Sequence, residues 1–266
     1  MRIVFVSGGC SEKEIVRAIA EVATMLAVKG AERVLIMETG KKEYGICEAF
    51  SSAMQKDLVR EEMRYYSLNG FEYLIQKCQM GELEPAEVRN NCDTVLKDSL
   101  YVLPVSGAEK YTGLTDLKKY ILEIAGAAES FASVILIDAC SGEESDIADY
   151  GDLCVVCMGE NEPSKEQKIS EYVNVFGENK VFYLICNDKK LSVYNRINLK
   201  RIYSLKDEMI AEIGWNERFM AAYEKGRAGE YIYHRVKNPF KDAVARNYLD
   251  SLYKASLMIR EAAAYG

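Results

Sequence analysis

The sequence alternates short apolar runs with stretches of helical periodicity. The runs are rich in β-branched residues and have the length of buried strands. They lie at residues 3–6, 33–37, 100–104, 133–137, 153–158, 181–185 and 209–213. Between the first two runs, apolar residues recur as on one face of a helix, at Ile15, Ile19, Val22 and Leu26. Continuous apolar strands separated by helices predict an α/β fold, with a mostly parallel sheet covered by helices on both faces.

Two regions depart from this alternation. Residues 52–99 contain helical patterns at 57–66, 70–80 and 84–91 and no strong strand, which predicts a helical insertion. Residues 240–263 carry apolar positions at four-residue spacing, which predicts a long amphipathic C-terminal helix. Because there are only four prolines and no repeat or low-complexity linker, we expect a single domain over residues 1–266.

Composition and charge exclude several classes of protein function. The chain is 49% hydrophobic and 28% charged, so disorder along its whole length is excluded. It carries 41 acidic and 34 basic residues, a net charge of −7, which argues against a protein whose main role is to bind nucleic acid. No apolar run approaches the ~20 residues of a membrane span, and the first residues resemble a strand more than a signal peptide. We therefore expect a cytoplasmic protein without direct membrane insertion.

Cysteines and histidine limit the chemistry further. The eight cysteines are irregularly spaced, which predicts reduced thiols, several of them in the core. Cys154 and Cys157 form a C-x-x-C, but in a strand their side chains point to opposite faces, so we interpret them as structural. His234 is the only histidine. A histidine-rich metal site is therefore not expected, and we expect a surface or loop position for this residue.

The segment after the first strand is where a phosphate-binding loop would lie. It reads Val6-Ser7-Gly8-Gly9-Cys10-Ser11-Glu12-Lys13-Glu14-Ile15. In a P-loop, glycines let main-chain N–H groups surround phosphates, a lysine neutralises their charge and a hydroxyl helps to hold Mg²⁺. Two adjacent glycines alone are a weak signal, because any tight strand-to-helix turn can require them.

This segment and the order of elements resemble the MinD/ParA family of P-loop ATPases, whose deviant Walker A box is K-G-G-x-G-K-[TS]. In an ungapped alignment, Ser7 falls on the signature lysine, Glu12 on the phosphate lysine and Lys13 on the Mg²⁺ hydroxyl. Gly8 and Gly9 match, Cys10 is the variable position and Ser11 replaces the third glycine. A shift by one residue places Lys13 on the phosphate lysine but puts Glu12 on a glycine.

Other motifs carry the resemblance along nearly the whole chain. The run Ile135-Leu136-Ile137-Asp138 with Gly142 resembles a Walker B strand, and Asp138 matches the aspartate that supports Mg²⁺ through water. Asn187 matches an asparagine that often binds adenine, whereas Gly40 replaces a catalytic aspartate. A structural role remains open for both, Asp138 as a helix cap and Asn187 as a turn residue.

The resemblance implies a P-loop NTPase-like, three-layer α/β/α fold with a degenerate phosphate site. Two like charges about 4 Å apart repel by about 4 kcal/mol when the effective dielectric is about 20, so Glu12 opposes phosphate binding. Nucleotide contacts would be vestigial or weak, with no catalytic residue and with ATP or ADP and Mg²⁺ as the only implied cofactors. The residues in question are Gly8, Gly9, Cys10, Ser11, Lys13 and Asn187, with Asp138 for Mg²⁺.

Two function classes follow from these observations. The first is a non-hydrolysing scaffold with protein partners, in localisation or regulation. Residues 100–104 resemble a strand of the TadZ/CpaE branch, which implies Flp/Tad-type pilus assembly or secretion machinery. The second is a genuine ATP-binding switch of the ParA/MinD type with an atypical phosphate loop. Because Ser7 is too short to reach a partner subunit's phosphates, we expect any homodimer to be independent of nucleotide.

Overall fold

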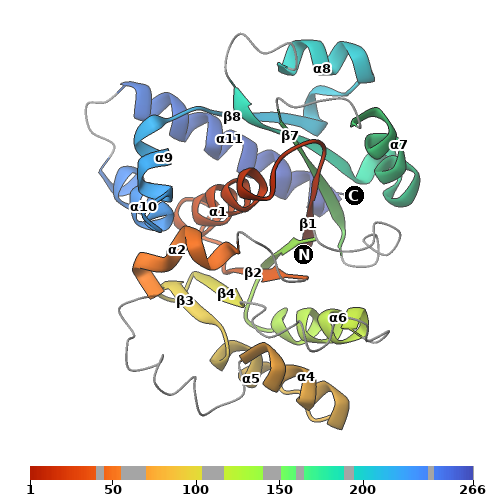
Figure 1. Ribbon diagram of the computed structural model, residues 1–266, viewed down its shortest axis with the longest axis vertical. Coiled ribbons are helices and arrows are strands. Elements are labelled where there is room, and N and C mark those ends of the chain that lie inside the picture. Colours follow the sequence, from red (N-terminus) through yellow and green to blue (C-terminus); the bar gives the residue numbers. More distant parts are fainter. Residues whose placement is uncertain are drawn as a thin grey trace.

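The computed structural model describes residues 1–39, 45–54, 70–103, 117–139, 151–159, 165–188, 195–238 and 243–265. Within these residues, one eight-stranded sheet runs through the molecule in the order β3-β4-β2-β5-β1-β6-β7-β8 (Figure 1). Its strands are β1 (Arg2–Ser7), β2 (Val34–Glu38), β3 (Asp93–Leu96), β4 (Leu100–Leu103), β5 (Val134–Asp138), β6 (Leu153–Met158), β7 (Val181–Asp188) and β8 (Ile210–Gly214).

In the spatial order from β4 to β8, each strand is parallel to the strands beside it. This confirms the predicted, mostly parallel sheet. The exception is β3, which pairs antiparallel with β4 at the edge of the sheet. Residues 52–99, predicted as a helical insertion without a strong strand, contain this short strand at Asp93–Leu96. This strand is short and only partly buried, and an edge strand with one neighbour needs few apolar residues, so its sequence signal is weak.

Helices cover both faces of the sheet, as predicted. One face carries α1 (Glu12–Val28), α2 (Ile46–Met54), α9 (Glu217–Tyr223), α10 (Ala228–Lys237) and α11 (Ala243–Tyr265). The other face carries α4 (Gly70–Met80), α5 (Pro85–Asn90), α6 (Leu117–Ala128), α7 (Lys165–Phe176) and α8 (Arg196–Tyr203). The result is a three-layer α/β/α arrangement with an apolar core on each side of the sheet.

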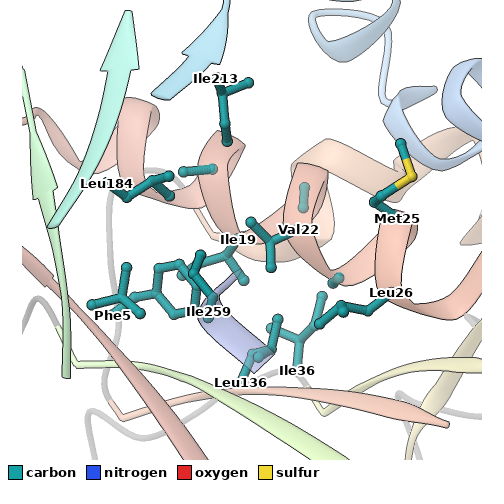
Figure 2. Close-up of a cluster of buried hydrophobic side chains, with 14 of the residues drawn as sticks. Phe5, Ile19, Val22, Met25, Leu26, Ile36, Leu136, Leu184, Ile213 and Ile259 are labelled. Atoms are coloured by element: carbon teal, nitrogen blue, oxygen red, sulfur yellow. The ribbon is translucent and has the colours of Figure 1, made fainter. Parts of the chain in front are cut away.

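Helix α1 is the centre of the first core. Figure 2 shows its apolar residues against side chains of the sheet and of α11, and the labelled contacts are Ile19, Val22, Met25, Leu26, Phe5, Ile36, Leu136, Leu184, Ile213 and Ile259. The helix is buried on its outer side as well, because it also packs against α10 and α11. It is therefore held on both sides, and its first turn is fixed at the edge of the sheet where the candidate site lies.

Successive residues of each strand enter opposite cores. In β6, Cys154 belongs to the core under α7 and Cys157 to the core under α1, and both are fully buried. This confirms the prediction that the C-x-x-C side chains point to opposite faces.

Several element predictions can be compared with the structure directly. The patterns at 70–80 and 84–91 correspond to α4 and α5, and the C-terminal pattern to α11. The pattern at 57–66 lies outside the described residues. His234 lies in α10 and not in a loop, and its side chain is exposed, so of the two expected positions the surface one is confirmed. Among the described helices, none is long and apolar enough to cross a membrane.

Candidate functional site

The turn between β1 and α1 lies at the carboxyl edge of the sheet, near its middle. In the registers of the parallel strands, Ser7 lies beside Cys157, Phe5 beside Asp138, and Glu38 beside Asp138. The ends of β1, β2, β5 and β6 therefore meet around this turn. In open α/β sheets, this edge is where ligands bind.

A network of short hydrogen bonds closes the turn. The Ser7 hydroxyl donates to the main-chain oxygen of Cys10 over 2.8 Å, and the Gly9 N–H donates to the Ser7 hydroxyl over 3.3 Å. The Gly8 N–H donates to the carbonyl oxygen of Cys157 over 2.8 Å, which ties the turn to β6. Ser7 thus braces the turn at the position that the resemblance gives to the signature lysine.

The geometry of the turn requires glycine at both Gly8 and Gly9. Gly9 has a φ of 100°, in the left-handed region that favours glycine. At Gly8, a Cβ would lie 2.5 Å from a methyl group of Val156, so a side chain does not fit. The glycine pair is therefore required by the turn itself, whether or not phosphate binds there.

The first turn of α1 is capped by the protein's own side chains. Ser11 is the N-cap, and its hydroxyl accepts from the Glu14 N–H over 3.3 Å. The Glu14 carboxylate in turn accepts from the Ser11 N–H over 2.9 Å, which completes a capping box. These main-chain donors belong to the helix terminus that holds phosphate in a P-loop, and here a carboxylate already occupies one of them.

Lys13 is directed toward α9. Its Nζ lies 3.8 Å from a carboxylate oxygen of Glu224, and its main-chain oxygen accepts from the Tyr223 hydroxyl over 3.2 Å. The side chain is 44% exposed, so this ion pair contributes little to stability. The one lysine of the segment is therefore engaged away from the turn that it was predicted to serve.

Two acidic residues end neighbouring strands beside the turn. Asp138 is fully buried at the end of β5, and its main-chain oxygen accepts from both the N–H and the hydroxyl of Thr39, each over 3.1 Å. Glu38 is also buried, and its carboxylate accepts from the Ile46 N–H over 2.7 Å at the start of α2. Sequence reasoning missed this capping role of Glu38, because Ile46 is eight residues away in the chain and α2 was not predicted.

A buried charged network lies behind the turn, and sequence reasoning missed it. Arg17 in α1 donates to the carbonyl oxygen of Cys186, and its Nε lies 3.6 Å from Glu21. The Tyr248 hydroxyl of α11 donates to Glu21 over 2.8 Å, and the guanidinium lies over the Trp215 ring, 5.8 Å from its centroid. Burial raises the pKa of Glu21 to about 7, against the opposing effects of Arg17 and the Tyr248 hydrogen bond. The i, i+4 spacing of Arg17 and Glu21 is the only sequence signal, and it is shared by many exposed helix pairs.

The structure thus gathers some of the predicted site residues and separates others. Gly8, Gly9, Cys10 and Ser11 form one turn beside Asp138, whereas Lys13 is directed away from it. Asn187 lies in β7, and its side chain, like Gly40 and Gly142, lies outside what the structure describes. Within the described residues, no group of three or more His, Cys, Asp or Glu side chains could hold a metal ion.

The fold is that of the MinD/ParA ATPases. The crystal structure of a ParA family ATPase from Chlorobium tepidum TLS is similar to this chain with a TM-score of 0.67 and 12% identity, over 96% of this chain and 98% of that one. The septum site-determining protein MinD from Pyrococcus horikoshii OT3, complexed with Mg-ADP, gives 0.65 and 12%, over 96% and 95%. The MinC:MinD cell division protein complex from Aquifex aeolicus gives 0.62 and 12%, over 98% and 96%.

This similarity is one of structure alone. No protein-family model matches the sequence, and no curated protein is significantly similar to it. At 12% identity the comparisons show the fold. In this site, Ser7, Glu14 and Lys13 are engaged in contacts within the protein.

Proposed function

We propose that this MinD/ParA-fold protein does not hydrolyse ATP and acts as a scaffold that localises or regulates a larger assembly through protein partners. The observation that carries the proposal is the capping box at the start of α1, in which the Glu14 carboxylate accepts from the Ser11 N–H over 2.9 Å. A phosphate placed at this terminus would meet the negative charge of Glu14 and, in the alignment given by the resemblance, that of Glu12 at the phosphate-lysine position. Like charges at close range repel by several kcal/mol.

Flp/Tad-type pilus assembly or secretion is the process that we propose for this scaffold, on the resemblance of residues 100–104 to the TadZ/CpaE branch. A protein partner is supported by the MinC:MinD complex among the similar structures, in which a protein of this fold is bound to another protein. We also propose that any homodimer forms through protein contacts alone, since Ser7 offers no cation to a partner's phosphates.

The alternative is an ATP-binding switch with an atypical phosphate loop. Two observations favour it: Asp138 is buried beside the turn, where an acid could support Mg²⁺ through water, and the similar MinD from Pyrococcus horikoshii OT3 is complexed with Mg-ADP. In this alternative, Gly8, Gly9, Cys10 and Ser11 would contact the phosphates through their main chain, Lys13 would have to leave Glu224, and Asn187 would contact the base. We propose that any such binding is weak.

Steady-state ATP hydrolysis in the presence of Mg²⁺ separates the two functions. The purified protein is compared with Asp138→Ala and with Asp250→Ala, which removes an exposed carboxylate on α11. We expect no turnover above background in any of the three. Turnover that persists in Asp250→Ala and is lost in Asp138→Ala would refute the scaffold and support the switch.

A further inference from the structure

A groove lies between α9 and α10, the two short helices that follow β8. Figure 1 shows these helices next to one another at the edge of the molecule. Tyr231 of α10 joins them, because its hydroxyl donates to the Asn216 side-chain oxygen over 3.2 Å and its ring centroid lies 5.8 Å from that of Phe219. The groove has a volume of about 500 Å³, which is within the usual range of ligand sites.

The charge of this groove is opposite to that of the chain as a whole. The chain carries a net charge of −7. Among the described residues that line the groove, Glu230 is the one acid and there are four bases, Arg218, Lys225, Arg227 and Arg235, so positive charge is in excess. A groove of this kind attracts an anionic ligand.

Helix stability does not account for two of these bases. Arg218 lies in the first turn of α9, and Arg227 is the N-cap of α10. The N-terminus of a helix carries partial positive charge, so a cation there is unfavourable for the helix itself. A ligand therefore explains the position of the two arginines better than folding does.

Two of the four bases are held in place before any ligand binds. The Arg235 guanidinium lies over the Tyr231 ring, 5.6 Å from its centroid. Arg227 donates through both Nε and Nη2 to one carboxylate oxygen of Glu230, each over 2.8 Å. Because these side chains are already ordered, binding costs less conformational entropy than it would for free side chains.

The charges beside the groove favour a short polyanion over a long one. Glu217 and Glu224 are exposed, and each directly precedes a base of the groove, Arg218 and Lys225 respectively. Duplex DNA carries one charge per about 1.7 Å of its axis, so it would meet these carboxylates as well as the bases. In contrast, α10 has 10 residues and is about 15 Å long, a length that about five extended peptide residues span.

We propose that the groove between α9 and α10 binds a short acidic segment of a protein partner. Carboxylates of the segment pair with Arg218, Lys225 and Arg235 and neutralise the excess positive charge. The proposal rests on the proposed function, in which the protein acts through protein partners, and it names the surface that such a partner contacts. ATP hydrolysis tests the scaffold and peptide binding tests the groove, so each of the two can fail without the other.

The test is fluorescence anisotropy of the full-length protein with a fluorescein-labelled peptide of alternating glutamate and alanine, about ten residues long, so that it exceeds the span of the groove. The matched control peptide has glutamine in place of glutamate. We expect the glutamate peptide to bind and its affinity to fall as salt is added, whereas the glutamine peptide should not bind. Carbodiimide, which joins carboxylates to amines, should couple the bound glutamate peptide to Lys225, the one lysine among the described residues that line the groove.

Double variants test the position of the site. Lys225→Gln/Arg235→Gln should weaken binding of the glutamate peptide about tenfold, because two charged contacts are lost. The control Arg201→Gln/Lys206→Gln removes the same charge from exposed positions in and after α8, on the other face of the sheet, and should bind like the wild-type protein.

Coupling to the wild-type protein needs no variant, so the test holds even if a double variant fails to fold. The proposal is overturned if the wild-type protein does not bind the glutamate peptide, or if the peptide couples to other lysines in place of Lys225. It is also overturned if both double variants lose affinity equally, or if duplex DNA binds the groove more tightly than the peptide does.

Discussion

The Ser7 hydroxyl donates a 2.8 Å hydrogen bond to the main-chain oxygen of Cys10 and also accepts from the Gly9 N–H. One small side chain thus holds both sides of the β1–α1 turn. Lysine, the residue that the resemblance assigns to this position, has no hydroxyl with which to make these contacts.

Removal of this hydroxyl should destabilise the protein. In Ser7→Ala, a main-chain acceptor and a main-chain donor in a partly buried turn lose their partner. We expect a loss of about 1–2 kcal/mol in the free energy of unfolding, measured by urea denaturation. The control is Ser130→Ala, where an exposed hydroxyl donates to the Ala127 carbonyl oxygen over 2.9 Å and where about 0.5 kcal/mol or less is expected. Equal losses in the two variants would show that Ser7 does not brace the turn.

The oligomeric state should be indifferent to nucleotide. A ligand shifts an association equilibrium only if it binds one state better than the other, and we propose that this turn does not bind phosphate. Light scattering over a range of protein concentrations should give the same mass without nucleotide, with ATP·Mg²⁺ and with ADP·Mg²⁺. A dimer that appears only with ATP·Mg²⁺ would contradict the scaffold and restore the switch.

The buried Glu21 should make stability fall as the pH rises from about 4.5 to about 7. Burial raises its pKa in the folded protein from 4.5 to about 7, so the folded state binds its proton more tightly than the unfolded state does. The stabilisation that the proton on Glu21 gives the folded state is fully present below about pH 4.5 and is lost as the pH passes 7. This shift corresponds to about 3 kcal/mol.

Glu21→Gln isolates this contribution. The amide oxygen can still accept from Tyr248, but the side chain no longer titrates. Urea unfolding between pH 4.5 and 8 should therefore show a shallower decline in Glu21→Gln than in the wild-type protein, while the exposed control Glu208→Gln should follow the wild-type curve. Parallel curves for Glu21→Gln and wild type would mean that Glu21 stays ionised in the fold.

The fold could be predicted from the sequence because its signals are local. The seven apolar runs all correspond to strands, since a strand buried on both faces must be apolar along its length. Strand β3 was missed because it lies at an edge, where burial demands less of its residues. Helix α2 was missed because its cap, Glu38, comes from the preceding strand and not from the helix itself.

The candidate site could be located but not described from the sequence. The position of Gly8 and Gly9 after the first strand was enough to indicate the turn. That Lys13 pairs with Glu224, and that Arg17 contacts Cys186 and Glu21, depends on helices that return to the turn from far along the chain. Such contacts leave no local pattern in the sequence.

The most direct test of the central claim is the affinity of the turn for ATP·Mg²⁺, measured by titration calorimetry. The wild-type protein is compared with the double variant Ser11→Gly/Glu12→Lys, which restores a glycine and the phosphate lysine, and with Ser11→Gly alone. Loss of the N-cap hydroxyl to glycine costs only a few tenths of a kcal/mol, so both variants should fold. We predict no measurable binding by the wild-type protein and a clear gain in the double variant alone. Tight binding by the wild-type protein would contradict a turn that excludes nucleotide, and no gain in the folded double variant would show that Glu12 is not what excludes it.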